Sequence, residues 1–368
     1  MMYRVIFMKL FRKLCIILFL SALTAFCMTD TELVREAVYE AVSRCLVTVI
    51  PSLYAMMTVS VLLTKSGMIS CIPKFISKPL SFIFGMNGSS LSVFILSSFA
   101  GYPVGAKMLA SQVSGGRLSR REAELLSGIC FGAGPAFIHG CIACRLFSSH
   151  DAGITILISA VSANILLAAA ISPFLRQYRK SDGSDASVEF SAEMLTESVI
   201  GSGRSMGGIC CMITAFSVFT ALLRRLGIIS FMARFINSLT GCGTAAAEGI
   251  FRSFLDITAA DSLPHGCFGL LPVIAALTSF GGVCVIMQVA AIAKDAFSLK
   301  PLILIRLAAS ALSFIICRLI MPFTLADTAV SAAEINVRLQ SASSPLPSLA
   351  LIAMTAALFC EYERFCKQ

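Results

Sequence analysis

Two polar centres rich in glycine and proline interrupt apolar segments in the first half of the chain. The first centre runs from Gly101 to Lys107 (GYPVGAK), and the second runs from Gly132 to Pro135 (GAGP). Proline breaks a helix, and the broken end offers free N–H groups and a positive dipole to a ligand. In a membrane, such a break is tolerated where protein covers it or where it lines a wet cavity. The two centres therefore predict a solute site inside a bilayer.

Lys107 is the one charged residue within the first centre. A charge in an apolar membrane segment is costly and is functional by default. Its ammonium could bind a substrate carboxylate or pair with Asp256 in the second half of the chain. The alternative is a lysine at the end of a hairpin that extends its amine to the cytoplasmic interface. Tyr102 could stack on an aromatic ligand or simply pack.

A second group of charges lies at helical spacing in the second half. Glu248, Arg252 and Asp256 are four residues apart, so a helix places all three on one face. Glu248 and Arg252 are then most simply an ion-paired stripe. Asp256 occupies the break position of this half and is the predicted ligand for a coupling ion, a proton or sodium.

The remaining candidates surround a further glycine pair. Gln288 follows this pair and can both donate and accept hydrogen bonds. Asn164, in an apolar segment, is more simply a contact between helices than a ligand. The predicted substrate-binding residues are Gly101, Tyr102, Pro103, Gly105, Lys107, Gly132, Gly134, Pro135, Gly281, Gly282 and Gln288.

Signals for an enzyme are weak. Cys141 and Cys144 form a single CxxC pair, and the chain has only three histidines, so neither a metal nor a cofactor is expected. His139 lies near the second break, where a packing histidine is the simpler interpretation. No serine–histidine–aspartate grouping, phosphate-binding loop or pair of catalytic carboxylates is evident.

The composition sets the class of protein. The 368 residues are 57% hydrophobic and 13% charged, with a mean hydropathy of +0.87, whereas a soluble domain carries about twice that charge fraction. The chain is therefore predicted to be a multi-pass membrane protein with all-α architecture. The net charge of +9 is scattered over short loops, which argues against nucleic acid as a partner. The 15 cysteines lie mostly in apolar runs, as small buried residues do.

The N-terminal segment favours an uncleaved first helix. Residues 1–13 are basic and residues 15–28 are apolar, a pattern that a cleaved signal peptide would share. The basic residues place the start of this helix in the cytoplasm, and the protein in the cell membrane. The sequence leaves the oligomeric state open, with a homo-oligomer allowed.

The order of apolar segments predicts the spans. A connector at 29–41 is followed by a span at 45–64 and a broken, shallow segment at 65–85. Residues 91–113 suit a re-entrant hairpin, residues 125–147 a broken span, and residues 153–175 a return span. A hydrophilic stretch at 176–202 then divides the protein, and a final short span is predicted at 345–360.

The two halves share motifs in the same order. Ser98-Phe99 matches Ser253-Phe254, and Phe131-Gly132 matches Phe280-Gly281. Pro173-Phe174 matches Pro322-Phe323 with the same offset of 149 residues as the preceding pair. The predicted domains are residues 1–44 as N-terminal helix and connector, 45–177 as first repeat, 178–204 as cytoplasmic linker, 205–326 as second repeat, and 327–368 as C-terminal segment.

Charge gives the orientation of these repeats. With a cytoplasmic N-terminus, nineteen Lys and Arg residues, Arg306 among them, fall on or near the cytoplasmic side, nine fall on the outer side, and Lys107 remains within the membrane region. The opening helices of the repeats then run in opposite directions. The sequence thus predicts two inverted repeats, each with a re-entrant hairpin and a broken transmembrane helix, which is a transporter architecture.

The break motifs resemble a known family. Phe99 to Lys107 (FAGYPVGAK), Gly134 to Ile138 (GPAFI), Ser279 to Gly282 (SFGG) and Met287 to Val289 (MQV) are similar to the bacterial sporulation integral membrane proteins of the YlbJ family. That family carries two nucleoside-recognition, or Gate, domains similar to the core repeats of concentrative nucleoside transporters. The resemblance, over about residues 40–325, implies transport of dipicolinic acid toward the forespore, with the outer forespore membrane as one location.

The expected function is therefore secondary transport of a small organic solute, and Lys107 favours an anionic one. The partners that this implies are the solute, the lipid bilayer and a coupling proton or sodium ion. Two alternatives remain open: a membrane scaffold for spore-envelope morphogenesis that transports nothing, and a nucleoside transporter.

Overall fold

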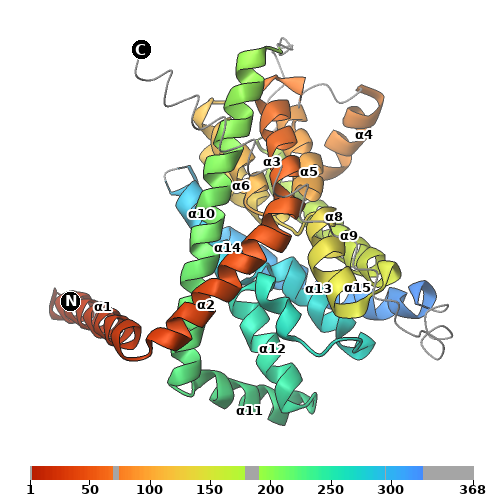
Figure 1. The fold of residues 1–368 in the computed structure, drawn as a ribbon. Coiled ribbons are helices and arrows are strands. Elements are labelled where there is room, and N and C mark those ends of the chain that lie inside the picture. The colour runs from red at the N-terminus through yellow and green to blue at the C-terminus, as the bar shows by residue number, and fades with distance from the viewer. Residues whose placement is uncertain (1, 69–73, 179–189, 295, 326–368) are drawn as a thin grey trace.

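The computed structural model describes residues 2–68, 74–178, 190–294 and 296–325, and all regular structure in these ranges is helical. The predicted final span at 345–360 and the C-terminal segment 327–368 lie outside the described residues, as does most of the first half of the predicted linker. Figure 1 shows the path of the chain.

Five helical stretches of the described residues are long and apolar enough to cross a membrane. They are Thr31–Lys65, His150–Arg176, Ala192–Arg225, Phe268–Ala293 and Lys300–Thr324. A sixth candidate is the pair Ser77–Phe84 and Gly88–Ala100, which is bent by 93°. The prediction of an all-helical, multi-pass membrane protein is confirmed.

The first half begins with α1 (Met2–Thr29). It continues through α2 (Thr31–Arg44), a π-helical turn (Cys45–Val49), α3 (Ile50–Lys65), α4 (Lys74–Phe84), α5 (Gly88–Ala100), α6 (Val104–Ser114), α7 (Arg120–Ile129), α8 (Pro135–Phe137), a π-helix (Ile138–Phe147) and α9 (His150–Arg176). The expected connector at 29–41 is not separate from the following span. No proline or glycine lies between Thr31 and Ile50, so α2 runs through the π-helical turn into α3.

The second half repeats this order of elements. It contains α10 (Ala192–Arg225), α11 (Ile228–Thr240), α12 (Thr244–Leu255), 3-10 helices at Ile257–Ser262 and Phe268–Leu270, α13 (Leu271–Phe280), α14 (Gly282–Ala293) and α15 (Lys300–Thr324). In both halves a glycine with φ of +66° follows the short helix after the long opening helix: Gly85 follows α4 and Gly241 follows α11. In both halves a proline lies near the end of the last long helix, at Pro173 and Pro322.

The predicted linker is shorter than the sequence suggested. The second half of the linker predicted at 178–204 is helical, because α10 begins at Ala192. The Ser191 hydroxyl caps this helix by accepting a hydrogen bond from Met194 N at 3.1 Å, and Glu193 in the first turn matches the helix dipole. A polar segment with these signals extends the helix into water.

The last long helices of the two halves pack antiparallel. Near the start of α9, the Thr155 and Thr324 hydroxyls lie 2.7 Å apart, and Thr324 is the last residue of α15. Farther along α9, Asn164 Oδ1 accepts a hydrogen bond at 2.7 Å from Arg306, which lies in the first two turns of α15. Residues farther along α9 therefore contact residues closer to the start of α15, as in an antiparallel pair.

The opening helices of the two halves are also antiparallel. Ser217 near the end of α10 donates to the carbonyl of Ala37 in α2 at 2.9 Å. The Tyr54 hydroxyl of α3 donates to the carbonyl of Val199 near the start of α10 at 3.3 Å. In Figure 1 the α2–α3 helix and α10 lie alongside one another. Both pairs of corresponding long helices therefore run in opposite directions.

A cross-linking experiment tests this packing. Thr155→Cys together with Thr324→Cys, in a background without native cysteines, should form a disulfide under mild oxidation. Thr155→Cys with Lys300→Cys is the control, because Lys300 lies 24 residues away at the other end of α15, about 36 Å along the helix. Non-reducing gel electrophoresis after cleavage between the two sites reports the link. Efficient linking of the control pair would contradict the antiparallel arrangement.

Candidate functional site

The breaks of the two halves meet where α7, α13 and α15 converge. The Tyr102 hydroxyl, in the first break, donates to the carbonyl of Thr278 in α13 at 2.6 Å. A Cβ added to Gly281 would lie 2.6 Å from the Phe131 ring. Phe131-Gly132 and its predicted counterpart Phe280-Gly281 are therefore neighbours in space, as expected for positions close to a twofold pseudo-axis.

Arg306 lies at the centre of this cluster and is fully buried. Its Nη1 donates to the carbonyls of Phe131 at 2.6 Å and Ser279 at 3.2 Å, and its Nη2 donates to Asn164 Oδ1. The guanidinium also lies 5.5 Å from the centre of the Phe131 ring. One side chain thus satisfies carbonyls that the breaks after α7 and near the end of α13 leave without helical partners.

The placement of Arg306 corrects the sequence analysis, which counted it among cytoplasmic charges. It is the seventh residue of α15, and therefore about 9 Å from the helix start. The signal that could have found it is a single arginine within the apolar run from Leu302 to Ala309. Asn164, predicted as a contact between helices, joins α9 to this arginine.

The predicted break glycines bring backbone against backbone. A Cβ on Gly101 would lie 2.9 Å from Gly134 N, and one on Gly134 would lie 2.9 Å from the Phe99 carbonyl. A Cβ on Gly105 would lie only 2.1 Å from the Cys130 carbonyl. The space beside these three residues is filled by the protein, so the geometry supports close helix packing.

The other predicted residues near the breaks are also tightly surrounded. A Cβ on Gly132 would lie 3.3 Å from Asn164 Nδ2, and one on Gly282 would lie 3.0 Å from Ile257 N. Pro135 is the first residue of α8, where a missing N–H costs nothing. Tyr102 is 5% exposed and packs against the Phe131 ring at 5.1 Å between centroids. Of its two open roles, packing is the one observed.

Lys107 points toward α10. Its Nζ donates to Ser205 Oγ at 2.7 Å and to the carbonyl of Gly201 at 3.3 Å. The suggested pair with Asp256 is wrong, because Asp256 follows α12 and binds Thr258 instead, through Thr258 N at 3.0 Å and Thr258 Oγ1 at 2.8 Å.

A cavity of about 370 Å³ elsewhere contains Asp256, but Lys107 borders a different one of about 270 Å³, here called the lysine cavity. Four helices, α3, α6, α10 and α14, form its wall. The lining residues are Met57, Pro103, Val104, Lys107, Ser205, Gly208, Ile209, Met212, Gln288, Ala291 and Ile292. The structure therefore brings together three of the predicted residues: Pro103, Lys107 and Gln288.

Sequence reasoning missed the α10 wall of the lysine cavity. Gly201, Ser205 and Gly208 are spaced by four and three residues, which places small residues on one helical face. This pattern was the available signal. Most of the lysine cavity's lining is apolar, and Ser205 and Gln288 are the polar side chains that line it with Lys107. Gln288 Nε2 lies 3.5 Å from Cys284 Sγ.

The expected stripe of Glu248, Arg252 and Asp256 is not formed. Asp256 lies beyond Leu255, the last residue of α12, and starts the next 3-10 helix as its N-cap. Glu248 pairs with Arg224 of α10 at 2.9 Å instead of with Arg252. The predicted helical face is incomplete because α12 ends at Leu255, one residue before Asp256. The role of Asp256 in ion coupling stays a prediction.

No three His, Cys, Asp or Glu side chains in the described part of the chain gather in a way that could hold a metal ion. No protein-family model, curated protein or solved structure matches the chain. The class of protein that the structure supports is a polytopic, all-helical membrane protein. The resemblance to the YlbJ family depends on the break motifs.

The close packing at Gly105 gives a stability prediction. Gly105→Ala should lower stability by about 1–3 kcal/mol, because the new methyl group would force α6 away from the Cys130 carbonyl. Gly207→Ala in α10 is the control, since nothing lies within 4 Å of its added Cβ. Thermal denaturation of the detergent-solubilised protein provides the measurement. Equal melting temperatures for the two variants would contradict the packing role of Gly105.

Arg306 gives a second prediction. Arg306→Met should lower stability by about 3 kcal/mol or more, because it leaves buried acceptors without a donor. Arg306→Lys should retain part of this stability, since an ammonium can still donate to some of these carbonyls. Arg318→Met, an exposed position in the same helix, is the matched control. A melting temperature of Arg306→Met equal to that of the control would rule out the bridging role.

Proposed function

We propose that this protein is a secondary transporter of a small organic anion across the bacterial cytoplasmic membrane. The observation that carries the proposal is the lysine cavity, which helices of both halves enclose beside the first break. The antiparallel packing of corresponding long helices supports inverted repeats at residues 45–177 and 205–326. In such an architecture the two repeats move against each other around a fixed site.

The broken elements supply the rest of this architecture. In the proposal, α5 and α6 form the re-entrant hairpin, and they pack against each other on either side of the Gly101–Pro103 break. The breaks at 130–134 and at Gly281 belong to the two broken transmembrane helices. The N-terminus lies in the cytoplasm, as the charge distribution favours.

The chemistry of the cavity favours an anion. An ammonium has three N–H donors, and Lys107 has two acceptors in the structure, Ser205 Oγ and the Gly201 carbonyl. One donor therefore remains for a solute carboxylate. The dipole at the start of α6 adds partial positive charge on the same side. The apolar wall suits a planar organic body, and about 270 Å³ limits the solute to a small one.

Dipicolinate satisfies these requirements, and the motif resemblance supports it as the solute, exported toward the forespore during sporulation. Asp256 carries the coupling proton or sodium ion in this proposal. A nucleoside is the second candidate solute: it would need the amide of Gln288 more than the charge of Lys107. A scaffold for envelope morphogenesis would need neither residue.

The test is solute uptake into proteoliposomes. Lys107→Gln should weaken transport of dipicolinate by roughly tenfold to a hundredfold, the usual effect of losing a charged hydrogen bond, whereas Lys107→Arg should be partly active. Lys78→Gln, an exposed lysine of α4, serves as control. In the same vesicles, Asp256→Asn should remove the response to an imposed proton or sodium gradient.

The outcomes separate the candidate functions. Uptake of dipicolinate at the parent rate by Lys107→Gln would exclude the anion site. Uptake of nucleosides alone, unaffected by Lys107, would favour the second solute. Parent protein that transports neither solute would support the scaffold.

A further inference from the structure

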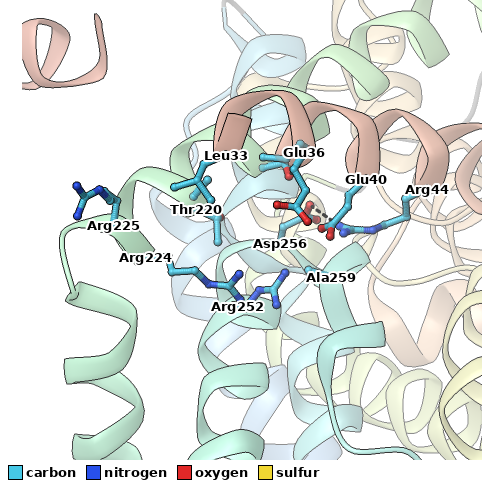
Figure 2. A pocket seen from close by; sticks show the side chains of 13 residues that line it. Leu33, Glu36, Glu40, Arg44, Thr220, Arg224, Arg225, Arg252, Asp256 and Ala259 are labelled. Carbon is cyan, nitrogen blue, oxygen red and sulfur yellow. Dashed lines mark hydrogen bonds and ion pairs between the residues drawn. The ribbon is translucent and has the colours of Figure 1, made fainter. Parts of the chain in front are cut away.

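A second cavity lies near the C-terminal end of α10. Its volume is about 370 Å³, and its walls are α2, the last turns of α10, α12 and the start of the following 3-10 helix. An adjoining cavity of about 460 Å³ shares Glu40, Arg44 and Arg252 with it. We call the two together the arginine cavity, and Figure 2 shows the first of them. This cavity shares no lining residue with the lysine cavity, and their nearest lining residues on α10, Met212 and Ser217, are five residues apart, or about 7.5 Å along the helix.

Arg44 is buried in this cavity with weak partners. Its side chain is 9% exposed, and its nearest carboxylate atoms are Asp261 Oδ2 at 3.7 Å and Asp256 Oδ2 at 3.9 Å. Its contact with Thr258 Oγ1 is 3.5 Å long. Asp256 has closer partners than Arg44, because Thr258 donates to both of its oxygens at 3.0 Å or less. Arg44 therefore retains hydrogen-bond donors that no short contact uses.

Arg252 presents a second set of donors to the same space. Its Nε is buried and has no hydrogen-bond partner among the described residues. Figure 2 shows the Arg252 side chain extending below Arg44 and Asp256 along the cavity. A buried N–H group without an acceptor is costly, so the Nε of Arg252 leaves the wall incomplete as it stands.

The other charges of the cavity do not complete it. Arg224 is bound to Glu248 at 2.9 Å, and Arg225 is bound to Asp30 at 3.2 Å. Glu36 and Glu40 line the opening from α2 but are exposed, so water can satisfy them. The buried wall therefore has hydrogen-bond donors that are not used, those of Arg44 and Arg252, and the partner that is missing is an acceptor.

We propose that the arginine cavity binds a small oxyanion, a carboxylate or a phosphate, between Arg44 and Arg252. Guanidinium groups recognise these anions through pairs of parallel N–H···O bonds. The site faces the outer side in the proposed orientation. Its role as an outer station for the transported anion depends on the proposed function, but the binding itself does not.

The absence of tryptophan from the chain provides a direct assay. Tyr39 lines the adjoining part of the cavity and is 75% exposed, so Tyr39→Trp introduces a single fluorescent reporter at the site. Dipicolinate and inorganic phosphate are titrated against the full chain in phosphatidylcholine nanodiscs. We expect saturable changes in fluorescence with at least one of the two anions.

Substitutions in the reporter background then assign the site. Arg252→Gln and Arg44→Gln should each weaken binding by about tenfold or more, and Arg252→Lys should weaken it less. Arg234→Gln, an exposed arginine of the nearby α11, is the matched control and should bind as the parent does. If Arg44→Gln fails to fold, Arg252→Gln still decides the outcome.

The remaining arms identify the source of the anion. Nanodiscs that contain phosphatidylglycerol test a lipid headgroup: a response there that requires Arg252 and that free anions do not compete with would assign the site to lipid phosphate. Binding by Lys107→Gln at parent affinity would show that the site is independent of the lysine cavity, even if transport fails. No response in any arm, or binding unaffected by both arginine substitutions, would overturn the proposal.

Discussion

The buried guanidinium of Arg306 is the interaction on which the centre of this protein depends. Broken helices leave carbonyl groups without partners, and inside a bilayer water cannot replace those partners. Arg306 donates to a carbonyl at a break in each half and to Asn164 of α9. The last helix of the second half thereby fixes the breaks of both halves relative to one another. In the proposed transporter, this crossing is a fixed point around which the two repeats rearrange.

Glycine makes that crossing narrow enough. Gly101, Gly105 and Gly134 each lie where a side chain would meet backbone atoms of another segment. Small residues of this kind allow close helix approach in membranes, where apolar burial alone drives little association. The same residue types that suggested ligand contact therefore serve packing first. The lysine cavity opens beside this crossing, at Pro103 and Lys107, where α6 turns toward α10.

Two cavities with free hydrogen-bond donors lie along α10. Beside the middle of α10, Lys107 has one donor left for the proposed solute. Near the end of α10, Arg44 and Arg252 have donors that the protein does not use. In the proposed transporter, two separate cavities are what alternating access requires, since one continuous channel would leak. In this view, the exposed carboxylates Glu36 and Glu40 limit how strongly an anion is held at the outer cavity, which favours its release.

The sequence by itself determined the class of protein, the positions of the breaks and the order of the repeated elements. These follow from composition and from local chemistry, because proline, glycine and long apolar runs act within a few residues of themselves. Only the tertiary structure decided which charges meet. Lys107 binds Ser205 and not Asp256, Glu248 binds Arg224 and not Arg252, and Arg306 lies at the centre and not at the surface. A side chain's partner depends on which helices cross and at what depth, and the spacing of residues within one helix carries no information about another.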